Sequence, residues 1–536
     1  MKKIIALVSA LLLWCSNAIF SQGQLDAYKY AQSDILGTAR YMSMSGAFGA
    51  LGGDISVMNA NPAGLGIYGR SEIVATLDIS SVAATSGWGE TSKGSNTQLY
   101  FGNIAYVNYF PTSNDAGVVS WNLGFSYNRL KDYNRTYTSR GLGNARSLTD
   151  YVAERTNRAG YHKDKLLATN SYDPYRNPEI SDWLAILGYN AVFIDAYKDK
   201  PNSYFSTFGS LDNNGVWHDF MLQQRELTVK ESGAIDQYNI AFGMNISDFL
   251  FLGADLAFTD IDYQYNSSYK ENFEQSNRLT LDNHLKTEGS GYQLNVGAII
   301  SPFNFLRLGA AYNSPTWYKM SDTYSATAYS NTYYWEKEIT ASAPDYDAPG
   351  VYDYRFNAPG KWLFSAAAII GKTAALSVDY ELTNFRHMST SDIDGIANKA
   401  TNDEINANFL PTNTLRVGGE LKVTPQFAIR AGAAFVANPM AAELKDGKTE
   451  VFTVGTIPHY TLDQTVTHYS AGLGYRFTPN FYMDIACIVK SQKEKLYAFS
   501  NIIDTTEGLP APKLETPSAA LKSETTRIAL TLGYKF

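Results

Sequence analysis

Large apolar residues recur at every second position in many segments of this chain, and Gly, Ser, Asn and Thr occupy most positions between them. The alternation is clearest over residues 119–128, 376–383, 469–477 and 527–536. It is typical of β-strands, because successive side chains point to opposite faces of a sheet. A soluble sandwich usually has a strongly charged outer face, whereas the second face here is small and polar with scattered charges. The pattern favours an all-β transmembrane barrel, with apolar side chains toward lipid and small polar ones toward the lumen.

Short breaks between the alternating segments predict the number of strands. Each break is polar or contains proline, and they lie at residues 110–115, 246–249, 301–305, 371–373, 424–426 and 478–480. If both chain ends lie on the side of these turns, six turns define seven hairpins and 14 antiparallel strands. One membrane crossing needs about 10 residues. We therefore expect most of the remaining chain to form outer loops.

The first 21 residues predict export. Lys2 and Lys3 precede an apolar run that ends at Trp14, as in a secretory signal peptide over residues 1–21. Cys15 would fit a lipoprotein signal, but Trp14 before it fits such a signal poorly. After this segment, no stretch of the sequence approaches the roughly 18 consecutive apolar residues of a membrane-spanning helix.

The longest predicted outer loop covers residues 130–226. It contains a predicted helix over residues 181–196, with Ser181 or Asp182 as N-cap. Two interpretations remain open: the helix gathers ligand at the mouth, or it packs over the barrel rim. Its apolar residues are Trp183, Leu184, Leu187 and Phe193. A second, polar helix over residues 392–407 fits ordinary loop structure.

Residues 22–68 do not alternate and are rich in small side chains. The glycines of residues 46–54 follow no strand and precede no Lys-Ser/Thr, so a phosphate-binding loop is not expected. Small residues also let a segment pack closely against other backbone, as a plug inside a barrel requires. Residues 22–68 are therefore predicted to form a plug, and residues 69–536 the barrel.

Several short motifs give the chain a family resemblance. They are Ala39-Arg40, Met44, Gly46-Ala47, Asp54, Asn61-Pro62-Ala63-Gly64-Leu65, Gly309-Ala310-Ala311-Tyr312-Asn313-Ser314-Pro315 and the terminal Tyr534-Lys535-Phe536. In these, the chain resembles the FadL/TodX family of outer-membrane transporters for hydrophobic compounds, particularly its long Bacteroidetes-type variants. Ser43 and Ser45 depart from the glycines usual in the family.

The resemblance implies a 14-stranded barrel in a Gram-negative outer membrane, closed by an N-terminal hatch that contains Asn61, Pro62, Ala63 and Gly64. It implies uptake of hydrophobic or amphipathic molecules such as long-chain fatty acids, captured among outer loops and released sideways at a kinked third strand. Gly124 is a candidate for the kink, although an ordinary lumenal glycine explains it more simply. Expected partners are the ligand, membrane lipids and the barrel assembly machinery, with Tyr534 and Phe536 as the terminal assembly signal.

Composition and charge exclude some functions. Charged residues make up only 18% of the chain and its net charge is −8, which argues against a nucleic-acid partner. A set of charged residues falls on the lumenal face by alternation: Asp255, Arg307, Asp379, Glu381, Arg416, Glu420, Arg430, Arg476, Asp484 and Arg527. These charges either anchor the hatch or meet a ligand carboxylate, or they form ion pairs that fill the lumen.

Catalytic and metal signals are weak. The six histidines lack the spacing of a metal site and no nucleophile motif such as Gly-x-Ser-x-Gly occurs, so we expect no enzyme, metal or cofactor. Another interpretation has the same barrel serve as a protein-docking or surface-attachment component of a secretion system. A nutrient receptor, for haem for example, is a weaker third possibility.

Overall fold

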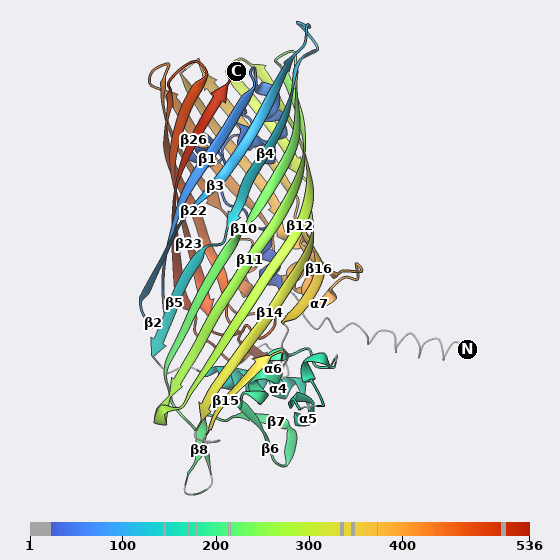
Figure 1. Ribbon diagram of the computed structural model, residues 1–536, viewed down its shortest axis with the longest axis vertical. Coiled ribbons are helices and arrows are strands. Elements are labelled where there is room, and N and C mark those ends of the chain that lie inside the picture. Colours follow the sequence, from blue (N-terminus) through green and yellow to red (C-terminus); the bar gives the residue numbers. More distant parts are fainter. Residues whose placement is uncertain are drawn as a thin grey trace, which may run out of the picture.

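The computed structural model describes residues 23–142, 146–169, 171–177, 179–212, 214, 216–332, 337–344, 349–371, 373–504 and 511–536. The predicted signal peptide, residues 1–21, lies outside the described residues. Figure 1 shows a tall barrel with the C-terminus and the short turns at its upper end, and with a helical region at its lower end.

In the described ranges, the wall consists of 14 antiparallel strands, as predicted, and β1 pairs with β26 to close it. The strands are β1 (Glu72–Gly87), β3 (Ser92–Pro111), β4 (Val118–Asp132) continued by β5 (Arg135–Leu142), β10 (Leu222–Ile246), β11 (Leu250–Phe273), β12 (Arg278–Phe303), β13 (Leu306–Asn313) continued by β14 (Thr316–Thr332), β16 (Gly350–Ala358) with β17 (Lys361–Ile370), β18 (Ala374–Asn384) with β19 (Ser389–Asp392), β20 (Pro411–Lys422), β21 (Phe427–Val436), β22 (Tyr460–Arg476), β23 (Phe481–Tyr497) and β26 (Ala519–Lys535). All six predicted turns lie between consecutive wall strands.

The outer face of the wall changes polarity along the longest strands. On β11, the outward residues from Leu250 to Phe258 are apolar, and those from Asp260 onward are polar. Phe258 lies opposite Tyr238 of β10 and Tyr292 of β12, where the same change occurs. The apolar band thus matches the about 9–11 residues of a membrane crossing and ends in an aromatic girdle.

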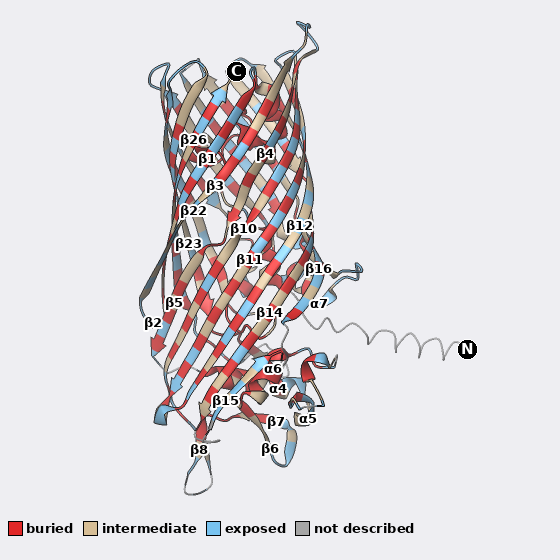
Figure 2. Cartoon of the chain, viewed as in Figure 1, coloured by how far each residue is buried: buried red, intermediate tan, exposed pale blue. Residues whose placement is uncertain are grey.

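Beyond this girdle, the inner face becomes apolar. Ile261, Tyr263, Tyr265 and Tyr269 of β11 are buried there, and Figure 2 shows the alternation of buried and exposed residues continuing to the strand ends. Part of the chain that was expected in outer loops belongs instead to the wall, because β10, β11 and β12 have 25, 24 and 26 residues rather than the about 10 of a membrane crossing. Their outer halves form a second barrel segment with an aromatic core.

Residues 23–68 lie inside the barrel (Figure 1) and form α2 (Gln24–Ala31), α3 (Ala39–Ser43), η2 (Ile55–Asn59) and η3 (Pro62–Ile67). We call this segment the hatch. At the long-loop end, the described residues between 147 and 220 form a compact region, here called the cap. The cap contains α4 (Leu148–Ala159), α5 (Lys163–Leu166), η4 (Pro174–Arg176), α6 (Trp183–Asn190), β6 (Ile194–Tyr197), β7 (Lys200–Ser206), β8 (Gly209–Leu211) and β9 (Trp217–Asp219).

Shorter elements complete the outer end and the loops: β2 (Gly89–Glu90), η5 (Glu274–Ser276), β15 (Lys337–Ala343), η6 (Phe385–His387), α7 (Lys399–Asn408), α8 (Ala442–Lys445), β24 (Ile502–Asp504) and β25 (Ala511–Leu514). α7 overlaps the second predicted helix, residues 392–407: it begins later, at Lys399, and ends one residue further on, at Asn408. Among the described residues, no helix is both long and apolar enough to cross a bilayer.

The helix predicted over residues 181–196 is shorter in the structure. Asp182 is its N-cap and accepts a hydrogen bond from the Ala185 amide at 3.1 Å. The helix ends at Asn190, since Val192 adopts a left-handed backbone with φ 57°. Phe193 therefore lies outside the helix, just before β6.

Candidate functional site

The Asn61-Pro62-Ala63-Gly64 motif caps a helix and ties two parts of the hatch together. Asn61 Oδ1 accepts a hydrogen bond from the Ala63 amide at 3.2 Å, and Pro62 occupies the first helical position, where its missing N–H is not needed. Asn61 Nδ2 donates to the Gly49 carbonyl at 2.6 Å. The motif thus fixes the segment of the hatch that touches the wall.

Lumenal glycines form the surface that receives this motif. Gly243, Gly253 and Gly297 lie side by side on β10, β11 and β12. A Cβ atom at Gly253 would overlap the backbone of Pro62, and one at Gly297 would overlap the Asn61 side chain. The strands therefore need glycine here because backbone and hatch are in direct contact.

Gly124 belongs to the same surface. A Cβ atom there would overlap Met58 of the hatch, and β4 runs through Gly124 without a break. The third wall strand is instead interrupted at Tyr133 and Asn134, between β4 and β5. The kink candidate is wrong, and the simpler interpretation of Gly124 as a lumenal glycine is confirmed.

Three of the predicted lumenal charges hold the part of the hatch that lies toward the short turns. Asp379 accepts hydrogen bonds from the amides of Phe48 and Gly49 at 3.0 and 2.9 Å. Arg307 donates to the Leu51 carbonyl at 2.7 Å. Glu420 pairs with Arg40 of the hatch at 2.9 Å.

Other predicted charges pair with one another across the lumen. Arg430 contacts Glu420 at 2.6 Å and Asp484 at 2.7 Å, and Arg416 contacts Glu381 at 2.9 Å. Both interpretations of the lumenal charges therefore apply, and Glu420 takes part in both kinds of contact. Arg476 fits neither interpretation, because it is exposed at the short-turn rim and forms no ion pair within the described ranges.

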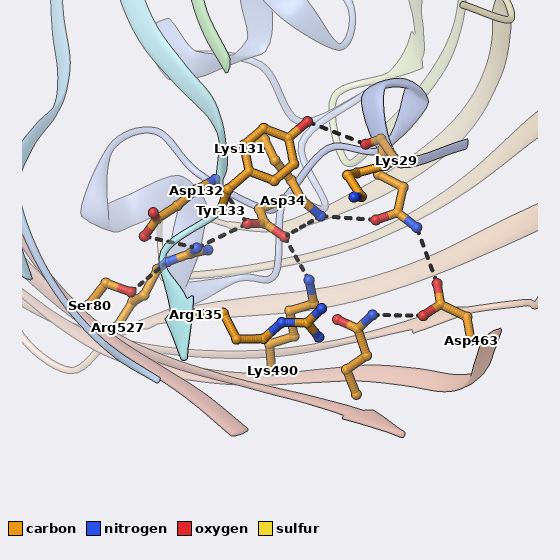
Figure 3. Close-up of polar contacts among 12 residues, drawn as sticks. Lys29, Asp34, Ser80, Lys131, Asp132, Tyr133, Arg135, Asp463, Lys490 and Arg527 are labelled. Carbon is orange, nitrogen blue, oxygen red and sulfur yellow. Dashed lines mark hydrogen bonds and ion pairs between the residues drawn. The ribbon is translucent and has the colours of Figure 1, made fainter. Parts of the chain in front are cut away.

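The outer part of the lumen, toward the cap, contains a cavity of about 150 Å³ between α2 and the wall. Beside it lies Asp34 of the hatch, whose carboxylate accepts hydrogen bonds from Lys490 and Arg527, both at 2.9 Å (Figure 3). Lys131 approaches the same carboxylate at 3.7 Å. Asp34 thus connects the hatch to β4, β23 and β26, and of these charges the sequence predicts Arg527 alone.

A second ionic cluster faces the same cavity. Arg135 of β5 pairs with Glu231 at 2.7 Å and with Glu494 at 2.5 Å. Asp463 accepts from the Tyr28 hydroxyl at 2.9 Å and from the side-chain amide of Gln492 at 2.7 Å. Extending the period-two alternation to the ends of β10 and β23 would have placed Glu231 and Glu494 on the lumenal face.

The wall has an unpaired seam beside this cavity. The hydrogen-bond ladder between β3 and β4 covers only Asn103–Pro111 of β3. On the other side of β3, the register between β3 and β1 shifts at Gly102. Beyond Asn103, β5 packs against β3 without ladder pairing among the described residues. The Gln98 side chain bridges the seam to Asn134 at 2.9 Å. We call this stretch the β3–β4 seam.

Arg129 covers the seam at the level of the aromatic girdle. Its guanidinium group lies 4.5 Å from the centroid of the Tyr100 ring on β3. It also pairs with Asp236 of β10 at 3.0 Å. The cavity reaches the seam from inside, because Asp132, Tyr133 and Asn134 line it.

The predicted ligand-gathering residues are all buried in the cap. Trp183, Leu184, Leu187 and Phe193 expose at most 2% of their surface and belong to the aromatic core. Trp183 packs edge-on against Tyr175 with centroids 5.0 Å apart, and it also lines an outer groove. This burial agrees with packing over the rim, the second of the two interpretations.

The terminal residues lie on the outer face of the last strand. Tyr534 and Phe536 are 47% and 57% exposed, as expected for lipid-facing side chains at the girdle near the short turns. The Phe536 amide donates to the Ser71 carbonyl at 3.0 Å, which helps to close the barrel. Their predicted role in assembly stays a prediction.

Similarity to known proteins agrees with this architecture. The chain resembles the crystal structure of a Pseudomonas aeruginosa FadL homologue, with 13% identity, a TM-score of 0.50 and coverage of 94% of this chain and 100% of the other. It is also similar, at TM-scores of 0.47 and 0.45, to the toluene transporters TodX of Pseudomonas putida and TbuX of Ralstonia pickettii. Each of these two shares 13% identity, with coverage of 94% of this chain and 99% of the other. No curated protein matches significantly.

The comparison with protein families gives a more extensive match than the low identities to the solved structures suggest. Residues 237–536, more than half of the chain, match the family described as outer membrane protein transport protein (OMPP1/FadL/TodX). This family is one of transport proteins rather than a class of enzymes. The chain belongs to the OMPP1/FadL/TodX family of outer membrane transport proteins.

Proposed function

We propose that the protein takes up hydrophobic or amphipathic small molecules through the outer membrane, with long-chain fatty acids as the example suggested by the family resemblance. The observation that carries this proposal is a lumen filled by the hatch together with a cavity that ends at the β3–β4 seam. A straight polar pore would serve sugars or ions. A filled lumen beside an unpaired wall suits a molecule that leaves sideways.

Capture would begin at the outer end. A groove of about 1310 Å³ lies between the cap and α7, and Tyr161, Trp183, Tyr352 and Phe452 are among the residues that line it. Aromatic side chains there offer apolar area, and each buried methylene of a ligand contributes about 0.8 kcal/mol. We expect the ligand to move from this groove to the inner cavity.

Release would occur through the β3–β4 seam into the outer leaflet. Hydrocarbon chains partition from water into a bilayer, whereas crossing the polar lumen on the short-turn side would expose them to charges. Opening requires Arg129 to leave Tyr100 and the Gln98–Asn134 bridge to break. The ladder bonds between β3 and β4 from Asn103 toward the short turn can stay intact during this step.

Cross-linking tests the exit route. In a Cys487→Ser background, Gln98→Cys and Asn134→Cys joined by a short bis-thiol reagent should stop uptake of a fluorescent fatty acid without unfolding the barrel. The control pair is Asn266→Cys and His284→Cys, which lie opposite each other in the continuous β11–β12 ladder. Uptake at the wild-type rate with a locked seam contradicts sideways release. Loss of uptake in the control as well would show an effect of the reagent alone.

The cap favours a second function to a lesser degree. Leu211, Val216 and Met221 are 63%, 52% and 57% exposed near its β8–β9 hairpin, as in a protein-docking surface. A secretion-system role predicts a stoichiometric partner that is lost when all three residues become Ser. Uptake that continues unchanged in this variant separates the two functions.

A further inference from the structure

His459 is a buried polar side chain without a protein partner in the described ranges. It is 3% exposed, and neither ring nitrogen forms a hydrogen bond there. Its ring stacks on Tyr265 with centroids 6.0 Å apart, and it lines the cavity of the outer lumen. Buried polar groups are nearly always hydrogen-bonded, so a donor and an acceptor left over at a cavity indicate a missing partner.

Each cationic side chain around the cavity already lies near a carboxylate. Lys29, Arg135 and Lys490 each pair with a carboxylate at 2.5–3.8 Å. Lys131 and Arg527 share Asp34. In total, five cations and six carboxylates line the cavity: Lys29, Lys131, Arg135, Lys490 and Arg527 against Asp26, Asp34, Asp132, Glu231, Asp463 and Glu494. An anionic ligand would have to displace one of these carboxylates.

Apolar side chains form another part of the lining, beside uncharged polar ones, and the space is small. Leu285, Val454 and Ile457 face the cavity together with the rings of Tyr133 and Tyr265. Its volume of about 150 Å³ matches a cavity that holds one benzene-sized group. The cavity can therefore receive a compact head group or a short chain while the hatch stays in place.

We propose that this cavity binds an uncharged amphipathic molecule whose hydroxyl, carbonyl or amide group forms a hydrogen bond with His459. The inference rests on the proposed uptake function and ranks uncharged amphiphiles above ionised carboxylates, such as a fatty-acid anion, at this cavity. His459 acts as a ligand-binding residue, and the apolar lining holds the hydrocarbon part.

The surroundings of His459 keep its imidazole neutral. Burial, and then the charge of Lys29, lower the pKa of His459 to about 3. A neutral imidazole has one donor and one acceptor nitrogen, which suits a hydroxyl or an amide. It supplies no positive charge to a carboxylate.

Two probes of equal chain length separate the head groups. Binding of 1-octanol and of octanoate to the purified full-length protein is measured by titration calorimetry at pH 8, where octanoate is ionised. We expect 1-octanol to bind at least 10-fold tighter than octanoate. Equal or tighter binding of octanoate overturns the proposal.

Variants assign the contact to His459. His459→Phe should weaken 1-octanol binding about 10-fold, whereas His459→Gln, which keeps a donor and an acceptor, should retain most of it. His284→Phe, on the outer face of β12, is the matched control and should bind like the wild type. Heat-modifiable migration in gels confirms that each variant is folded. Unchanged binding by His459→Phe means that water alone satisfies His459 and overturns the proposal.

The result also separates this inference from the proposed function. If 1-octanol does not bind at the cavity but the wild type still takes up fatty acid through the seam, the inference fails and the function stands. If the wild type shows neither binding nor uptake, both fail.

Discussion

Replacing Asp34 by Asn removes the charge at the centre of the hatch contact in the outer lumen and keeps the shape of the side chain. Asp34 has two cations at 2.9 Å and a third at 3.7 Å. Removing one partner of a buried ion pair costs about 3–5 kcal/mol. Asp132 remains 3.7 Å from Arg527 and offsets part of the loss, so we expect about 3 kcal/mol.

The loss should appear as local opening of the hatch. The Asp34 amide donates to the Leu130 carbonyl at 2.7 Å, so its hydrogen exchange reports on this contact. A loss of about 3 kcal/mol predicts roughly 100-fold faster exchange at residue 34. The part of the hatch toward the short turns, held by Asp379 and Arg307, should exchange at the wild-type rate.

Asp132→Asn is the matched control, because it removes a carboxylate from the same cluster on the wall side. It should change exchange at residue 34 by less than 10-fold. The reasoning is refuted if Asp34→Asn accelerates exchange by less than 3-fold, or if both variants act equally.

Three further predictions concern the wall, the cap and the terminus. Gly253→Val would place a side chain against the Pro62 backbone and should open an ion conductance in planar bilayers. The control Ala254→Val, on the lipid side, should not conduct. A Gly253→Val barrel without conductance would contradict the contact between Gly253 and the hatch. Burial raises the pKa of Glu271 from 4.5 to about 7, so its contribution to cap stability is full below about pH 4.5 and is lost as the pH rises through about 7. Hydrogen exchange of the α4 amides, corrected for their intrinsic rates, should therefore be slower at pH 6 than at pH 8.5, and Glu271→Gln should abolish the difference. An equal pH effect in that variant would contradict the assignment to Glu271. Deleting Phe536 should lower the amount of folded barrel in the outer membrane several-fold on heat-modifiability gels, and normal assembly would count against a terminal signal.

The alternation along the chain was sufficient to predict the wall, because each strand has one face toward lipid and one toward the lumen. The same alternation continues past Phe258, where Asp260 and Asp262 take the outward positions. Period two alone does not show that the outer environment has changed from lipid to water. The strands were therefore predicted too short and the loops too long.

The hatch contacts could be predicted less well. Asp34 lies in a segment with no periodicity, so its partners on β4, β23 and β26 follow only from the folded barrel. Asp379 and Arg307 were placed correctly on the lumenal face, but whether they meet the hatch or each other depends on three-dimensional proximity. Phe193 was included in the helix predicted over residues 181–196, but the left-handed Val192 separates it from the helix, which ends at Asn190.

The change of polarity at Phe258 and Asp260 also fixes the depth of the protein in its bilayer. Sliding the barrel inward by two residues would draw Asp260 and its neighbours on other strands below the interface, at a cost of order 1 kcal/mol for each charged group. Sliding it outward would expose the apolar band to water. Summed around the circumference, these costs resist adjustment to bilayer thickness by vertical movement. A thicker or thinner membrane must instead deform around the protein.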